Sequence, residues 1–411
     1  MKKIFYVFSS LCVLIIFIIF NNFDRNEIKD FIKEKFHPKI YLTSLTLFGD
    51  TEHMYNLMHN DYNVRFLPFT QHQNFDVKKI KIGLGTFNKD EKTKNYNYVK
   101  NKNFLKYHMG KLIVANTQGE IGEYNLETSV VDKIIKLNDV LEIFDIGSFN
   151  NDLYFSIIEE NNGCPKFKIL KTNSIKKESF EEIFSSKECT YPNSAKITFK
   201  YLDNKPTLFL AYHSAVLYND KPDLDSQNEN YLSGKVIAIN LDNGHSEIFT
   251  KGHRNIMGLY ADDSVILSTE MGPRGGDEIN LLNKNNNYGW DISSYGTKYI
   301  TKEFYKNHQE QGFKEPLFTF IPSIGISELL KINGKKFNKS WQNNFVLASL
   351  NFNHIIRIKF SDNFSRVIFK ENIYIGERIR DLEINEEKSL IFLSTDSGEL
   401  IILTPIDTQL K

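Results

Sequence analysis

Six similar two-part units follow one another along this 411-residue chain. In each unit an apolar run rich in β-branched and aromatic residues leads through a short turn into a second run of alternating polarity, which predicts a β-hairpin. The units lie at 111–127, 152–171, 207–220 with 234–244, 264–283, 344–363 and 388–405. They begin about 40 to 80 residues apart, and the shorter spacings are typical of propeller blades. The repeat therefore predicts an all-β, six-bladed β-propeller.

Composition and the segments between the units favour the same fold. The chain has 33 Phe and 20 Tyr, residues that favour strands over helices. Apart from a possible short helical piece at 26–35, no amphipathic stretch of helical length separates the units. We expect one domain over residues 40–405, with a strand near residues 39–47 closing the ring on the last blade, because closure removes exposed sheet edges. A β-sandwich is the alternative, but six similar hairpins are unusual for one.

The first 25 residues predict a signal anchor helix or a signal peptide. Lys2 and Lys3 precede an uncharged apolar segment, Ile4–Phe20. An uncleaved anchor is favoured because no small residues of the Ala-x-Ala kind follow this segment, although cleavage and secretion stay open. The two lysines should remain cytoplasmic. Residues 26–39 then form a linker, and the propeller lies in the periplasm, anchored to the inner membrane.

The cysteines are consistent with an exported domain. Cys12 lies in the apolar segment, so the predicted exported part contains only Cys164 and Cys189. An oxidising compartment permits them to pair, and we expect a disulfide, with two free thiols as the alternative. A metal site is disfavoured because no second Cys or His pair lies nearby at ligand spacing.

Charge excludes one class of partner. The chain has 51 basic and 51 acidic residues and therefore no net charge. A basic patch or tail of the kind that nucleic-acid-binding proteins use is absent from the sequence. Nucleic acid is not expected as a partner.

Several dense segments carry a resemblance to a known family. They are GHRN (252–255), TEMGPRGGDEINLLNKNNNYGW (269–290), GERIRD (376–381) and STDSGEL (394–400). In this order they resemble the pyrroloquinoline quinone (PQQ)-dependent glucose and aldose sugar dehydrogenases, the glucose/sorbosone dehydrogenase family. The resemblance is strong over residues 232–405. It implies a six-bladed propeller, and a PQQ- and calcium-dependent oxidoreductase that oxidises the anomeric carbon of a sugar to a lactone and passes electrons to an external acceptor.

The resemblance also implies a cofactor site. PQQ carries three carboxylates, which suit the bidentate donors of arginine. The positions that match the family's cofactor contacts are Arg254, Asn255, Arg378 and Arg380, with Asp277 close by. The carbonyl oxygens of Gly272 and Pro273 match the calcium ligands, a donor type that Ca²⁺ accepts.

Each of these segments also has a purely structural interpretation. Arg378 and Arg380 alternate along a strand and could pair with acidic neighbours. GPRGGD is typical of a tight hairpin turn, since such turns demand glycine. Tyr288 and Trp290 are expected in the blade core. The presence of all these segments together, in the family's order, favours the cofactor site over these structural interpretations.

Three positions depart from the family pattern. Pro192 stands where the family has its catalytic histidine, and proline accepts no proton. Met271 and Asn351 replace a polar residue and a lysine. His213 and His253 are the candidates for a substitute base, since histidine titrates near neutral pH. The alternative function is a catalytically inactive propeller that binds a sugar, an anionic ligand or a protein partner.

Overall fold

A computed structural model describes residues 75–81, 102–177, 179–213, 223–334 and 337–405. These ranges belong to one compact unit, residues 67–411. They contain strands and three short 3₁₀ helices, η3 (Ile175–Lys177), η4 (Leu224–Ser226) and η5 (Gln309–Gln311), and no α-helix. A helix with the length and apolar character to cross a membrane is not found in them. The predicted anchor, the linker and residues 40–74 lie outside the described residues.

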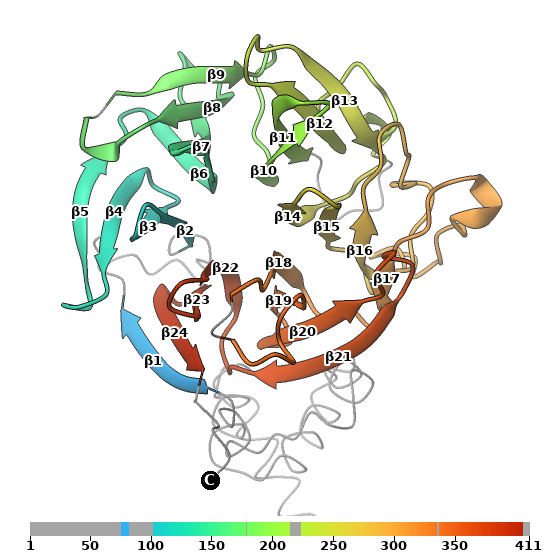
Figure 1. The fold of residues 1–411 in the computed structure, drawn as a ribbon. Coiled ribbons are helices and arrows are strands. Elements are labelled where there is room, and N and C mark those ends of the chain that lie inside the picture. The colour runs from blue at the N-terminus through green and yellow to red at the C-terminus, as the bar shows by residue number, and fades with distance from the viewer. Residues whose placement is uncertain (1–74, 82–101, 178, 214–222, 335–336, 406–411) are drawn as a thin grey trace, which may run out of the picture. The chain divides into compact units, whose positions relative to one another are not determined.

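The strands form six four-stranded antiparallel sheets arranged as a ring (Figure 1), and we call the central region that the innermost strands surround the channel. This confirms the predicted six-bladed β-propeller. The first three blades are β2 (Asn103–His108), β3 (Lys111–Asn116), β4 (Glu120–Asn125) and β5 (Val130–Lys136); β6 (Val140–Phe149), β7 (Asp152–Glu159), β8 (Lys166–Thr172) and β9 (Glu181–Ser185); and β10 (Ser194–Leu202), β11 (Lys205–His213), β12 (Lys235–Asn240) and β13 (Ser246–Lys251).

The other three blades follow the same order. They are β14 (Ile256–Ala261), β15 (Ile266–Glu270), β16 (Asp277–Leu281) and β17 (Phe318–Phe320); β18 (Ile326–Lys331), β19 (Phe345–Ser349), β20 (His354–Phe360) and β21 (Val367–Tyr374); and β22 (Ile379–Asn385), β23 (Leu390–Thr395), β24 (Glu399–Pro405) and β1 (Phe75–Lys81). The six predicted hairpins are the second and third strands of the six blades.

The ring is closed by an N-terminal strand, but not by the one expected. β1 pairs antiparallel with β24, from Phe75 opposite Pro405 to Lys81 opposite Glu399. It supplies the outermost strand of the sixth blade and covers an edge that would otherwise be open. The prediction of residues 39–47, which lie outside the described residues, was therefore wrong for this position. The apolar run at 39–47 gave the stronger strand pattern. β1, with the sequence FDVKKIK, has three lysines, which is typical of the outermost strand of a sheet.

Neighbouring blades pack face to face through buried apolar side chains. Between the fifth and sixth blades the cluster includes Val346, Ile355, Leu382, Leu393 and Ile401, each no more than 1% exposed. Burying such side chains contributes about 1.5 to 3 kcal/mol each. These interfaces hold the innermost strands in place around the channel.

Cys164 and Cys189 are joined by a disulfide, with 4.9 Å between their Cα atoms. Cys164 lies in the turn between β7 and β8, and Cys189 lies in the loop that leads to β10. We expect mass spectrometry of the unreduced protein to recover both cysteines in one linked peptide pair, which reduction separates. Labelling of both residues by a thiol reagent in the folded, unreduced protein would contradict this pairing.

Candidate functional site at the entry mouth

The loops that lead into the innermost strands meet at one end of the channel. β2, β6, β10, β14, β18 and β22 are the innermost strands, and each is the first strand of its blade (Figure 1). Because every blade has the same order, these strands run in the same direction. Their starts, and the hairpins between second and third strands, therefore lie at one end, which we call the entry mouth.

All the residues that the resemblance implicates lie in loops or strand ends at the entry mouth. Arg254 and Asn255 immediately precede β14, and Arg378 and Arg380 flank the first residue of β22. The other positions are Gly272, Pro273 and Asp277 at the β15–β16 turn, Asn351 between β19 and β20, and Pro192 before β10. Contacts divide them into an arginine pair on the sixth blade and a second cluster around Arg254.

Arg378 and Arg380 share one carboxylate. Arg378 Nε donates to Asp396 Oδ2 at 2.9 Å, and Arg380 donates to both Asp396 oxygens, from Nε at 2.8 Å and from Nη2 at 3.0 Å. Arg378 Nη1 also donates to Asn351 Oδ1 at 2.7 Å. The register of β22 shifts between Ile379 and Asp381, so a bulge at Arg380 lets both guanidinium groups reach one partner. The expected pairing with an acidic neighbour and the expected position at the mouth are both present.

A lysine from the first blade joins this group. Lys102 Nζ lies 3.9 Å from Glu142 Oε1, and the hydroxyl of Tyr191 donates to Glu142 Oε2 at 2.8 Å. Burial is the largest cause that lowers the pKa of Lys102, and Arg380 lowers it further, while Glu142 and Asp396 raise it. Three cations, Lys102 and the two arginines, therefore face two carboxylates. Sequence reasoning assigned neither Lys102 nor Asp396, although Asp396 is in the STDSGEL motif.

Arg254 belongs to the second cluster, on the fourth blade. Its Nη1 donates to the carbonyl of Met271 at 2.7 Å, and its Nη2 contacts the Tyr299 hydroxyl at 3.2 Å. The Tyr299 hydroxyl donates in turn to the Pro273 carbonyl at 2.9 Å. The Arg254 guanidinium lies 5.4 Å from the ring of Trp290, which is 9% exposed. Arg254 therefore contacts the β15–β16 turn of its own blade, whereas Arg378 and Arg380 bind Asp396 on the sixth blade.

Asp277 holds the glycine turn from behind. Its Oδ1 accepts a hydrogen bond from the Gly272 N–H at 3.1 Å, and its Oδ2 accepts from the N–H groups of Ile324 and Ile326 at 2.9 and 3.0 Å. A Cβ on Gly272 would lie 2.3 Å from the carbonyl oxygens of Gly275 and Gly276, so only glycine fits there. Asp277 therefore fixes the shape of the turn, with both oxygens engaged.

The two candidate histidines differ in their hydrogen bonds. His253 uses both ring nitrogens, Nε2 with Thr250 Oγ1 at 2.8 Å and Nδ1 with Glu270 Oε2 at 3.0 Å. His213 uses Nε2 with Asp223 Oδ2 at 2.9 Å, whereas its buried Nδ1 has no hydrogen-bond partner among the described residues. His253 is therefore a loop-fixing residue, and His213 has one nitrogen available.

A separate group of charged side chains lies deeper in the channel, and we call it the channel cluster. It consists of Lys196, Asp145, Glu328 and Asp381. The ammonium of Lys196 on β10 lies 2.6 Å from Asp145 Oδ1, 2.6 Å from Glu328 Oε2 and 3.7 Å from Asp381 Oδ1. Oxygens of these three carboxylates lie within 4.8 Å of one another, a spacing that could suit a metal ion. Because the lysine already supplies the positive charge there, we assign the cluster to blade-to-blade bonding.

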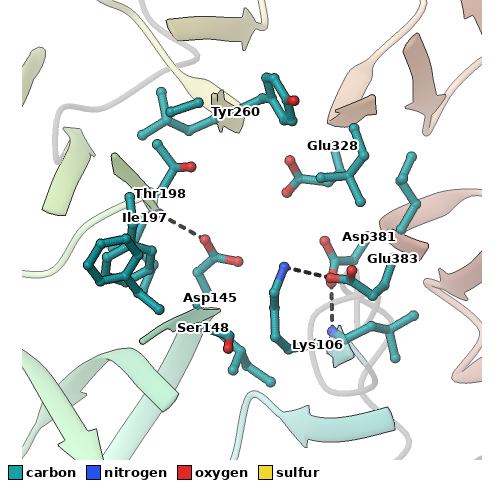
Figure 2. Close-up of a pocket in the computed structure, with 18 residues that line it drawn as sticks. Lys106, Asp145, Ser148, Ile197, Thr198, Tyr260, Glu328, Asp381 and Glu383 are labelled. Carbon is teal, nitrogen blue, oxygen red and sulfur yellow. Dashed lines mark hydrogen bonds and ion pairs between the residues drawn. The ribbon is translucent and has the colours of Figure 1, made fainter. Parts of the chain in front are cut away.

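Beside this cluster is a cavity of about 210 Å³ (Figure 2). Its polar wall includes Lys106, Ser148, Thr198, Tyr260 and Glu383. Most of these residues belong to the later halves of the innermost strands, so the cavity lies toward the end of the channel opposite the entry mouth. It is separate from the candidate cofactor site.

The residues at the entry mouth fit an anionic ligand. The arginine pair offers charge-assisted donors for such a ligand. The buried Oδ1 of Asn255, an acceptor without a hydrogen-bond partner within the described ranges, would instead bind a donor group of the ligand or a water. A buried polar atom of this kind normally bonds to a ligand or water. For calcium the fit is conditional, because a cation on the Pro273 carbonyl would replace the hydrogen bond from Tyr299.

Comparisons with known proteins identify the family. The family profile described as Glucose / Sorbosone dehydrogenase matches residues 110–403. Aldose sugar dehydrogenase YliI of Escherichia coli is 29% identical over 49% of this chain and 58% of that protein. Quinoprotein glucose dehydrogenase B of Acinetobacter calcoaceticus is 26% identical over 43% of this chain and 50% of that protein. The matched parts span about half the length of these relatives.

Solved structures share the fold. The soluble aldose sugar dehydrogenase of Escherichia coli in the apo form has a TM-score of 0.63 at 19% identity, covering 80% of this chain and 100% of that one. The PQQ-bound aldose sugar dehydrogenase of Streptomyces coelicolor has a TM-score of 0.59 at 16% identity, covering 81% and 98%. The family profile covers well over half of the sequence, including blades upstream of the strong motifs. This chain is a member of the glucose/sorbosone dehydrogenase family.

Proposed function

We propose that the protein is a PQQ- and calcium-dependent sugar dehydrogenase that oxidises the anomeric carbon of an aldose to a lactone and passes the electrons to an external acceptor. The observation that carries the proposal is the arginine pair on Asp396 at the entry mouth of this family's propeller. Asp396 holds the guanidinium groups of Arg378 and Arg380 in a fixed orientation before a ligand binds, so little side-chain entropy is lost on binding.

Four side chains would hold the cofactor, and the glycine turn would hold the cation. Arg378 and Arg380 would bind carboxylates of PQQ, and Arg254 and Asn255 would bind from the fourth blade. When bound, PQQ would supply a quinone as hydride acceptor, and the carbonyls of Gly272 and Pro273 would hold a calcium ion that polarises this quinone. Tyr299 would release the Pro273 carbonyl to the cation.

Replacing Arg378 by glutamine is expected to weaken PQQ binding about 10- to 150-fold, because a charge-assisted hydrogen bond contributes roughly 1.5 to 3 kcal/mol. Binding can be followed by the absorption spectrum of the quinone, added to the full-length protein with Ca²⁺. Arg366 is the control, since it is exposed in the turn between β20 and β21, and Arg366→Gln should bind normally. Unchanged affinity in Arg378→Gln would place the ligand elsewhere.

A measurement of catalytic turnover distinguishes the proposed enzyme from a catalytically inactive propeller. Adding aldoses to the PQQ-loaded protein should reduce the bound quinone. Binding without reduction by any aldose would favour an inactive propeller that keeps the ligand site, a reading supported by Pro192 and by Asn351, whose side chain binds Arg378. Failure to bind PQQ at all would reject the proposed cofactor site, whether the propeller is active or not.

We also propose that this domain works in the periplasm on the outer side of the inner membrane, held there by residues 1–25. The disulfide between Cys164 and Cys189 supports an oxidising compartment. Fractionation of cells should find the protein with the inner membrane, and accessible to protease added from the periplasmic side.

A further inference from the structure

His213 lies next to the loop that contains Pro192. It is the last residue of β11 and pairs with Ser194, the first residue of β10. Its carbonyl accepts a hydrogen bond from the N–H of Asn193 at 2.7 Å. The second strand of each blade ends at the entry mouth, so His213 stands at this mouth, one strand away from Pro192.

Asp223 fixes the orientation and the tautomer of the His213 ring. Asp223 Oδ2 accepts from His213 Nε2 at 2.9 Å and from Trp290 Nε1 at 3.0 Å, and Oδ1 accepts from the Ser226 N–H at 3.3 Å. Burial opposes ionisation of Asp223, but the hydrogen bonds from His213, Trp290 and Ser226 together lower its pKa. An ionised Asp223 requires a hydrogen on Nε2, so the lone pair of the neutral ring is on Nδ1.

That lone pair has no donor among the described residues, although His213 is only 2% exposed. Burial is the largest cause that lowers the pKa of His213, and Arg254 lowers it further, while Asp223 and Glu270 raise it. The ring is therefore neutral at neutral pH and able to accept a proton. A histidine oriented through one nitrogen by a carboxylate, with the other nitrogen available, is the usual arrangement of a general base.

We propose that His213 Nδ1 is the proton acceptor of the sugar oxidation, with Asp223 as its positioning residue, in place of the base that Pro192 cannot supply. This rests on the proposed function. As the C1–O bond becomes a carbonyl, the hydroxyl proton passes to Nδ1, directly or through one water. The C1 hydrogen leaves with two electrons to the quinone cofactor, and the proton on His213 is later released to solvent.

The test combines a ring measurement with turnover. In the ¹⁵N-histidine spectrum of the full-length protein, without cofactor, His213 should be a neutral ring protonated at Nε2 at pH 7, assigned by its loss in His213→Gln. Glutamine can keep the hydrogen bond to Asp223 through its own Nε2 but has no basic nitrogen. With PQQ, Ca²⁺ and glucose, His213→Gln should lower kcat about 10²- to 10⁴-fold and remove the acidic limb of the pH profile.

The control is His253→Gln, another buried histidine of the same mouth, which should leave that acidic limb in place. A His213 ring that is cationic, or protonated at Nδ1, at pH 7 overturns the assignment. So does an active wild type whose His213→Gln variant keeps its rate and pH profile. If the wild type oxidises no aldose, the proposed function fails, and the ring measurement still decides whether His213 is a poised proton acceptor.

Discussion

Replacing Lys196 by methionine is expected to destabilise the folded protein by about 3 to 5 kcal/mol, the typical effect of removing one partner from a buried ion pair. The ammonium is the shared partner of Asp145, Glu328 and Asp381, and its side chain is 7% exposed. Methionine fills a similar volume but leaves three carboxylates within 4.8 Å of one another. The free energy of unfolding by urea measures the loss.

The loss should depend on pH in a defined direction. Burial is the main cause that raises the pKa of Asp381, to about 6, even though Lys196 lowers it. Without the lysine these carboxyl pKa values rise further, so the variant is least stable above them and recovers as pH falls and the carboxyls take up protons. The difference between wild type and variant should be larger at pH 8 than at pH 5.

Lys200→Met is the matched control. Lys200 lies on the same strand and donates to the backbone carbonyl of Asp263 at 3.1 Å, so its removal should change stability by less than about 1 kcal/mol. Equal stabilities of Lys196→Met and Lys200→Met would show that the channel cluster does not hold the blades together.

The stability of the wild type is expected to fall as pH decreases from about 6.5 to about 4, in part because of His354. Burial is the largest cause that lowers the pKa of this histidine, to about 4. The unfolded chain takes up the proton near pH 6.5 and the folded chain only near pH 4, so stability is complete above 6.5 and is lost through this window. The shift corresponds to about 3 kcal/mol.

His354→Asn should abolish that part of the pH dependence, because asparagine can keep the contact with the Phe352 carbonyl and does not titrate. Unfolding measured in urea at pH 4.5 and pH 7.5 gives the comparison. His245→Asn serves as control, since His245 is exposed and should leave the curve as in wild type. A wild-type slope retained in His354→Asn would assign the acid sensitivity to other groups.

The fold was predictable because its signal repeats. Each hairpin is short and ambiguous alone, but six of them share one pattern, and the second strand of every blade is buried along nearly its whole length. The closing strand was not predictable in this way. β1 is an outer strand with three lysines among seven residues, so its pairing with β24 depends on the ring and not on its own apolar pattern.

The site was predictable only where chemistry lies within a motif. Arg254 and Arg378 could be placed at one mouth, since their loops precede innermost strands. The hydrogen-bond partners of the site residues could not be predicted from the sequence. Asp396 lies 18 residues beyond Arg378, and Asp223 is 67 residues away from its partner Trp290. The distinction between His213 and His253 likewise depends on which ring nitrogens have partners, which residue spacing does not determine.

The sixth blade combines residues 75–81 with residues 379–405. During synthesis the first of these segments emerges long before the second, so β1 has no strand to pair with until residues 399–405 have been made. A transcript truncated before codon 399 would lack β24 entirely, leaving β23 unpaired along one edge and β1 without a neighbour. Such products expose strand edges that proteases and chaperones recognise, so only chains that contain both segments of the sixth blade close the ring and escape this recognition.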